Sequence, residues 1–453
     1  MFKRKVTDKL LEWKNKYSDS YAVLLQGARR VGKRTSPKNF AEENYKSYIL
    51  IDFSNISKDV LEIFDDMSNL DFFFLRLQTI SSTKLYERQS VIIFDEIQLM
   101  PKVRQAIKHL VADGRYDYIE TGSLISIKKN VEGIVIPSEE MKIEVYPMDY
   151  EEFCWACNKD YSMLDKINQF NKPVGQGTNR VLMRDFRLYM AIGGMPQAVN
   201  TYLENKTFQE IDRVKKEIIE LYKEDFRKID PSGRISMMYD SIPSQLALGK
   251  SKFILSSAIN KKITKKDEKL LYDLIESKTI LICYNVTQPS ISLNLTKDID
   301  EYKLYLSDIG LFTTMLFNDK RIISENIYSK LLSDKLEANL GYLYENAIAQ
   351  IIKSNDRELY YHSWANNNGR KYEIDFLISD KNKIIPIEVK SSNHNNHKSI
   401  LEFSNKYSNV ISRRILFSQK DIDNEGMLEL KPIYLSPVII NKLKNDNKSN
   451  KNI

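Results

Sequence analysis

Residues 27–33, which read GARRVGK, have the types and spacing of a loop that binds phosphate. In the pattern G-x-x-x-x-G-K-[ST], backbone N–H groups and the lysine hold the phosphates, and the final hydroxyl binds Mg²⁺. Gly27, Gly32 and Lys33 occupy the required positions, but Arg34 stands where serine or threonine is expected. The sequence therefore predicts a phosphate-binding loop with a positive charge in place of the metal-binding hydroxyl.

The residues after this loop favour nucleotide binding over turnover. Thr35 does not replace the missing hydroxyl, because one step along a helix rotates a side chain by ~100°. Pro37 removes a backbone donor in the first helical turn. Arg34 can supply positive charge in place of the metal, but a guanidinium cannot reproduce octahedral coordination by oxygen. The predicted nucleotide-binding residues are Gly27, Arg30, Gly32, Lys33, Arg34, Thr35 and Ser123.

An acidic pair completes the chemistry expected beside a nucleotide. Asp95 and Glu96 end the apolar run SVIIFDE, residues 90–96. Asp95 is predicted to hold Mg²⁺, directly or through water, and Glu96 to polarise the attacking water as the catalytic carboxylate. The run that ends at Ser123 is expected to bring a polar side chain beside the γ-phosphate.

A second group of residues, near the C-terminus, has the composition of a metal-dependent phosphodiesterase site. In residues 384–390 apolar side chains alternate with Glu388 and Lys390, so the two-residue period of a strand places these two on one face. A hairpin around residues 380–383 would set Asp375 opposite Glu388.

Glu345, on a helix expected before this hairpin, could complete the C-terminal group. In this interpretation Asp375 and Glu388 bind Mg²⁺, Glu345 assists from its helix, and the Lys390 ammonium stabilises developing charge on the phosphate. The alternative is a salt bridge at the edge of a sheet, with no chemistry.

Alternating strands and helices are expected to position the phosphate loop and the acidic pair. The apolar runs are typical of strands buried on both faces of a parallel sheet. Between the third and fourth runs, Pro101 suits a first helical position and Gly114 a stop. This pattern predicts a doubly wound α/β domain over residues 1–150. The expected strands are residues 21–27, 47–53, 90–96, 116–123 and 142–148.

Beyond residue 150 the chain is predicted to become helical and then to form a second α/β region. Residues 151–235 read as a helical connector. In residues 236–330, helices followed by a β-hairpin have the outline of a winged helix, which binds DNA or protein. Seven lysines in residues 250–269 could face DNA or RNA, or form an ordinary solvated surface. Residues 331–440 form the second α/β region, and the polar residues 441–453 are expected to be disordered.

Length and composition argue against a membrane-spanning protein and against a small disulfide-rich protein. The chain is 42% hydrophobic and 28% charged, which is ordinary for a globular protein. Its 453 residues are too many for a single hydrophobic core. The net charge of +7 permits a polyanionic partner without requiring one. Three cysteines indicate a reducing compartment, and no window is apolar over the length of a bilayer. We therefore predict a cytoplasmic protein with no membrane partner.

The order of motifs resembles that of bacterial and archaeal AAA-superfamily ATPases with a C-terminal domain of unknown function. The motifs that carry this resemblance are GARRVGK, IIFDEIQLMPKVRQAIKHLV, IETGSLISI, YPMDYEEF and AIGGMPQAV, and the match spans residues 3–437. It implies an ATP-binding domain, a winged-helix-like middle and a restriction-endonuclease-like end. The C-terminal group resembles the PD-(D/E)xK nuclease pattern at Glu345, Asp375, Glu388 and Lys390.

Two functional hypotheses follow. In the first, the protein binds ATP with Mg²⁺, and the first domain gates a metal-dependent, nuclease-like domain that acts on DNA or RNA. In the second, it is a nucleotide-binding interaction protein or scaffold that cleaves nothing, which Arg34 favours. Members of the resembled family read G-K-[ST]-T at the loop, so Arg34 departs from their pattern. The sequence does not determine the oligomeric state, and a homo-oligomer is one of the possibilities.

Overall fold

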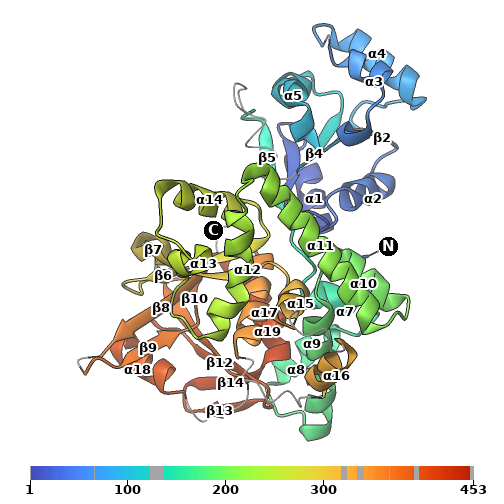
Figure 1. Cartoon of the computed structure of the whole chain (residues 1–453). Coiled ribbons are helices and arrows are strands. Elements are labelled where there is room, and N and C mark those ends of the chain that lie inside the picture. The colour runs from blue at the N-terminus through green and yellow to red at the C-terminus, as the bar shows by residue number, and fades with distance from the viewer. Residues whose placement is uncertain are drawn as a thin grey trace. The chain divides into compact units, whose positions relative to one another are not determined.

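The computed structural model describes two compact units, which are treated separately below (Figure 1). The first contains residues 1–146 with the short segment 276–278, and the second contains residues 147–275 and 279–453. The described residues are 2–65, 67–122, 137–317, 324–333, 341–366, 368–391 and 397–448. Within these ranges, no helix combines the length and the apolar composition that crossing a bilayer requires.

The first unit is built on a five-stranded sheet. All neighbouring strands are parallel, in the order β2-β3-β4-β1-β5. This confirms the predicted α/β fold: four strands lie within their expected ranges, and the fifth lies at residues 140–144 where residues 142–148 were expected. The strands are β1 (Ala22–Gln26), β2 (Ser47–Asp52), β3 (Ser90–Asp95), β4 (Asp117–Gly122) and β5 (Glu140–Glu144).

Helices cover both faces of this sheet. Leu24, Ile92 and Phe94 pack on one face against α4 and α5, while α1 and α2 pack together and α2 lies on β2 and β3. As predicted, α5 begins at Pro101 and is capped by Gly114, whose φ of 74° suits glycine. The helices are α1 (Lys5–Lys16), α2 (Thr35–Asn44), α3 (Lys58–Ile63), α4 (Leu70–Ser81) and α5 (Pro101–Asp113), with the 3₁₀ turns η1 (Phe53–Asn55) and η2 (Ile97–Leu99).

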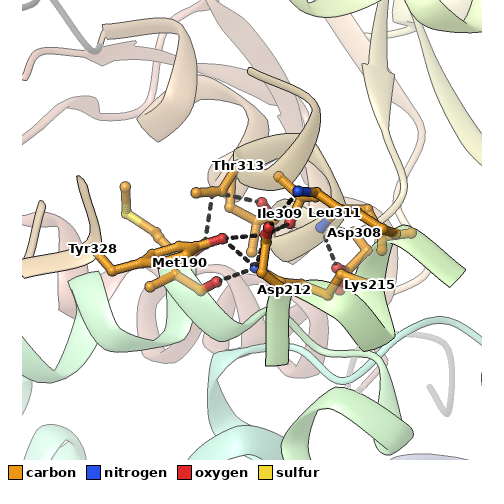
Figure 2. Close-up of polar contacts among 11 residues, drawn as sticks. Met190, Asp212, Lys215, Asp308, Ile309, Leu311, Thr313 and Tyr328 are labelled. Atoms are coloured by element: carbon orange, nitrogen blue, oxygen red, sulfur yellow. Dashed lines mark hydrogen bonds and ion pairs between the residues drawn. The ribbon is translucent and has the colours of Figure 1, made fainter. Parts of the chain in front are cut away.

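The second unit starts as a helical array held by a buried polar cluster (Figure 2). The Lys215 ammonium is fully buried and donates to Ala191 O at 2.7 Å and to Tyr328 Oη at 2.8 Å. Asp212 accepts from Tyr328 and Thr314 and lies 3.8 Å from Lys215. Burial lowers the pKa of Lys215 to about 8, with Asp212 opposing it. These bonds join α11 (Phe208–Ile229) to α9 (Gln176–Ile192), α15 (Ile309–Phe317) and α16 (Ser324–Leu332).

The AIGGMPQAV motif is explained by close packing in this array. A Cβ on Gly194 would collide with the backbone of Met148, and one on Gly310 would collide with the backbone near Gly193. Asp308 accepts from the Gly194 N–H at 2.6 Å and the Leu311 N–H at 2.8 Å. The helices are α7 (Tyr150–Ala156), α8 (Ser162–Phe170), α9 (Gln176–Ile192), α10 (Pro196–Leu203), α11 (Phe208–Ile229), α12 (Arg234–Ala247), α13 (Leu255–Ile259), α14 (Lys265–Glu276), α15 (Ile309–Phe317) and α16 (Ser324–Leu332).

Two sheets follow in the second unit. The first has the order β7-β6-β8-β9, and the second has the order β10-β11-β12-β14-β13. Because β6 pairs with β8, the hairpin of the expected winged helix shares a sheet with the expected nuclease-like region. The winged-helix interpretation of residues 236–330 stays a prediction. The strands are β6 (Ile280–Val286), β7 (Lys297–Leu306), β8 (Leu359–Ala365), β9 (Lys371–Ile374), β10 (Phe376–Asp380), β11 (Lys383–Val389), β12 (Arg414–Ser418), β13 (Asp423–Glu425) and β14 (Leu428–Pro432).

The C-terminal end corrects one expectation. Residues 441–453 were expected to be disordered, but the last helix, α19, continues to Lys448. Ile440 and Leu443 are buried, and α19 packs on α17 and α8. Residues 449–453 lie outside the described ranges. The remaining elements are α17 (Gly341–Ser354), α18 (Lys398–Lys406), α19 (Ser436–Lys448), η3 (Leu293–Thr296), η4 (Ser408–Val410) and η5 (Ile433–Leu435).

Candidate functional sites

The predicted phosphate loop connects β1 to α2, as its motif requires. Arg30 adopts a left-handed conformation with φ of 68°, and Gly32 has φ of 100°. The first helical hydrogen bond runs from Ser36 N to Gly32 O at 3.0 Å. Pro37 lies in the first turn of α2 without interrupting it, since N–H groups there have few intrahelical partners.

The loop is fixed by contacts with the segment that follows β5. Gly27 passes so close to Val145 that a Cβ would collide with its carbonyl oxygen. The buried guanidinium of Arg4 donates to Val31 O at 2.9 Å and to Tyr146 O at 2.7 Å, which joins the loop to this segment. Arg4 was not predicted from the sequence, because its partners are backbone atoms far along the chain.

Lys33 folds back over the loop that precedes it. Its ammonium donates to Gly27 O at 2.9 Å and to Ala28 O at 2.7 Å, and the residue is 8% exposed. A positive charge is therefore fixed at the mouth of a loop whose helix-forming end supplies backbone donors.

Arg34 lies between two carboxylates at the end of the sheet. Its Nη1 is 2.6 Å from Asp52 Oδ2 and its Nε is 3.3 Å from Asp95 Oδ2. The carboxylates are neighbours because β2 and β3 are parallel and pair Asp52 with Asp95 in register. Burial would raise the pKa of Asp52, but hydrogen bonds from Ser54 and the charge of Arg34 hold it below its ordinary value.

Thr121 organises the acidic pair from the end of β4. Its hydroxyl donates to Asp95 and accepts from the Glu96 N–H at 3.3 Å. Glu96 adopts a left-handed conformation with φ of 57° and accepts a hydrogen bond from Gln98. Burial raises the pKa of Asp95, which is 3% exposed. The structure thus brings together both predicted acidic residues at the edge where the loop lies.

These residues fit a nucleotide better than a nucleotide with Mg²⁺. The loop offers backbone donors and Lys33, but the Asp95 carboxylate that would hold the metal is already paired with the Arg34 guanidinium. Thr35 is the first residue of α2 and is exposed. Ser123 lies outside the described residues.

The C-terminal group has the predicted register. Strands β10 and β11 are antiparallel and pair Phe376 with Ile387, which sets Asp375 beside Glu388. Asp375 accepts from the Val389 N–H at 2.7 Å, and Lys390 lies 2.7 Å from Glu388. The hairpin prediction is therefore confirmed.

Three further residues belong to this group and were not predicted from the sequence: Lys303, Tyr305 and Glu373. Lys303, on β7, pairs with Glu373 and lies 4.0 Å from Glu345 Oε2. Tyr305, two residues along β7, donates to the same Glu345 oxygen at 3.3 Å. No local signal links Lys303 to the hairpin of β10 and β11, since the contact depends on the pairing of β6 with β8.

Burial sets the protonation behaviour of these carboxyls. Burial, followed by the charge of Asp375, raises the pKa of Glu345 to about 7, with Lys303 opposing. Burial also raises the pKa of Glu373 and of Glu388. Within the part of the chain that the structure describes, no three or more His, Cys, Asp or Glu side chains are arranged to hold a metal ion. Metal binding by Asp375 and Glu388 stays a prediction.

Comparison with known families identifies the first domain. Residues 19–154 match the model of a family described as an AAA domain. The five parallel strands, the loop after β1 and the acidic pair after β3 agree with that match. The first domain is an AAA-type P-loop domain. The glycines and lysine of this AAA domain match the P-loop pattern, whereas Arg34 does not.

The rest of the chain matches two families described as domains of unknown function. Residues 183–321 match DUF8612, and residues 340–433 match DUF4143. Lys303 lies in the segment matched by DUF8612. The carboxylates of the C-terminal group lie in the segment matched by DUF4143, and they are Glu345, Glu373, Asp375 and Glu388. None of the curated proteins matches the chain.

Solved structures show only distant likeness. A Walker-type ATPase of Pyrococcus abyssi is 18% identical, with a TM-score of 0.42, over 70% of this chain and 96% of that chain. A STAND protein with a tetratricopeptide repeat sensor from Pyrococcus horikoshii is 12% identical, with a TM-score of 0.29, over 78% of this chain and 48% of its own. The RuvB Holliday junction branch migration motor of Thermotoga maritima is 11% identical, with a TM-score of 0.27, over 62% and 89% respectively.

Proposed function

We propose that this protein is a nucleotide-binding interaction protein whose AAA domain holds adenine nucleotide with Arg34 in place of Mg²⁺. The observation that carries the proposal is the position of the Arg34 guanidinium, 2.6 Å from Asp52 and 3.3 Å from Asp95. In this role Lys33 and the loop N–H groups bind the phosphates, and Arg34 supplies the nearby positive charge.

Hydrolysis is expected to be weak for the same reason. A metal ion organises the phosphates and neutralises the charge that develops in phosphoryl transfer, and a guanidinium supplies charge without that coordination. Glu96 directly follows Asp95 and is the carboxylate that we propose for water activation, so the proposal attributes weak hydrolysis to Arg34 and not to the loss of this carboxylate. The domain would therefore respond to nucleotide by binding and by exchange.

The test is nucleotide binding and turnover on one preparation of the full chain, with and without nucleic acid. We expect calorimetry to detect ATP binding while phosphate release stays below ~1 s⁻¹, a rate at the low end for enzymes. Ordinary turnover would reject the role of Arg34, and an absence of ATP binding would reject the function as a whole.

A second candidate function is metal-dependent cleavage of nucleic acid, gated by the AAA domain. It is supported by the register that sets Asp375 beside Glu388, with Lys390 directly after the strand that carries Glu388. Its test is Mn²⁺-dependent cleavage of plasmid and single-stranded substrates, in the presence of ATP, by the parent and by Asp375→Asn, Glu388→Gln and Lys390→Ala. Equal behaviour of parent and variants would leave a structural domain. The lysines of residues 250–269 remain a predicted nucleic-acid contact.

A further inference from the structure

A buried lysine lies inside the C-terminal carboxylate group. Lys303 is 5% exposed, pairs with Glu373, and lies 4.0 Å from Glu345 Oε2. Its ammonium also lies 5.3 Å from the centre of the Tyr361 ring, which is itself fully buried. An ammonium in such a position needs partners of opposite charge, because removing a charge from water is costly without them.

The position of Lys303 is built by a segment distant from the carboxylates. Lys303 and Tyr305 are two residues apart on β7, so both point to the same face of the sheet. Both reach Glu345 on α17, and Lys303 also reaches Glu373 on β9. A strand from the segment matched by DUF8612 thus supplies the cation for carboxylates in the segment matched by DUF4143.

The charges of the cluster show what Lys303 compensates. The cluster has four carboxylates and two ammonium groups, and Lys390 is already paired with Glu388 at 2.7 Å. Glu388 is 2% exposed, so its negative charge also needs compensation inside the protein. Lys303 adds the second positive charge and contacts Glu373 and Glu345 directly. The full group is Glu345, Glu373, Asp375, Glu388, Lys303 and Lys390.

We propose that Lys303 is a built-in counter-cation that takes the electrostatic place of a divalent metal ion in this carboxylate cluster. The cluster then folds without a metal, and a divalent ion must compete with an ammonium that the β6–β7 hairpin holds in place. The inference is independent of the nucleotide-binding proposal. It predicts weak metal binding by the parent protein, whereas the second candidate function requires the parent to bind a metal ion.

The experiment measures Mn²⁺ binding to the full chain without nucleotide, for the parent and for Lys303→Met. Methionine preserves much of the apolar length of lysine and removes its charge. We expect the variant to bind Mn²⁺ at least ~10-fold more tightly than the parent, because the carboxylates lose their internal cation. Lys303→Arg keeps the charge and should bind Mn²⁺ as weakly as the parent. Equal binding by parent and Lys303→Met would overturn the proposal.

A double variant tests where the gained Mn²⁺ binds, and melting temperatures test the proposal if Lys303→Met folds poorly. In Lys303→Met combined with Asp375→Asn, the gained Mn²⁺ binding should disappear; if it persists, the ion is bound elsewhere and the proposal fails. If Lys303→Met is destabilised by repulsion among the carboxylates, Mn²⁺ should raise its melting temperature while leaving that of the parent unchanged. A destabilised variant that Mn²⁺ does not stabilise would also contradict the proposal.

Discussion

Replacing Arg34 by threonine should make nucleotide binding depend on Mg²⁺. The substitution removes the guanidinium from Asp52 and Asp95 and restores the hydroxyl of the P-loop pattern. The Arg34 side chain is 57% exposed, and ion pairs of this kind contribute only ~0–1 kcal/mol to the free energy of unfolding. The variant should therefore stay folded, so that binding can be compared directly.

The size of the effect follows from the charges. A Mg²⁺ ion bound to the Asp95 oxygen that faces Arg34 would lie roughly 4 Å from the guanidinium, given ordinary Mg²⁺–oxygen distances. A double and a single positive charge at that separation repel by ~2 kcal/mol in a medium as polar as water. The exposure of Arg34 makes this solvent-screened value the appropriate one. It corresponds to about 30-fold in Mg²⁺ affinity.

Calorimetric titration of ATP, in Mg²⁺ and in EDTA, measures this effect. In the parent the two affinities should be similar, and in Arg34→Thr the affinity in Mg²⁺ should exceed that in EDTA by about 30-fold. Arg34→Ala separates the charge from the hydroxyl and should give a smaller gain, while Arg34→Lys should behave as the parent does. Equal Mg²⁺ dependence in the parent and in Arg34→Thr would refute the assignment of Arg34 to the metal position.

Three further predictions test other contacts. Lys33→Ala should abolish ATP binding in calorimetry, because the ammonium fixed at the loop is lost; unchanged affinity would disprove the P-loop role. Thr121→Val should lower the free energy of unfolding in urea by ~1–3 kcal/mol, because Asp95 loses a buried hydrogen bond, and Thr121→Ser should lower it less. His362 lies on β8 and is 2% exposed, and burial lowers its pKa to about 4. The stability that its neutral form contributes is complete above pH 6.5 and is lost as the pH falls towards 4, by ~3 kcal/mol. His362→Gln should flatten this part of the pH dependence of unfolding, and an unchanged profile would assign the loss to other groups.

The AAA fold could be predicted from the sequence because its signals are local. Continuous apolar runs specified buried strands, and Pro101 with Gly114 bounded a helix. The hairpin register that sets Asp375 beside Glu388 also followed from strand alternation and from the turn between the two runs. Each of these features depends on residues that are near one another in the chain.

The missed contacts depend on pairing between distant segments. Asp52 could have been predicted from the sequence, because it lies at the end of an expected strand. In the structure this strand pairs with the strand that ends at Asp95. Lys303 was not, because its place beside Glu373 requires knowledge that β6 pairs with β8. The continuation of α19 to Lys448 was also missed, because residues 441–448 are polar except for Leu443.

The central claim is that Arg34 takes the place of Mg²⁺ beside Asp95. The most direct test is the ratio of ATP affinities of the parent protein in Mg²⁺ and in EDTA, measured at equal ionic strength. We predict a ratio close to one, since the positive charge beside the phosphates belongs to the chain. A ratio of ~10 or more in favour of Mg²⁺, equivalent to at least ~1.4 kcal/mol, would contradict it.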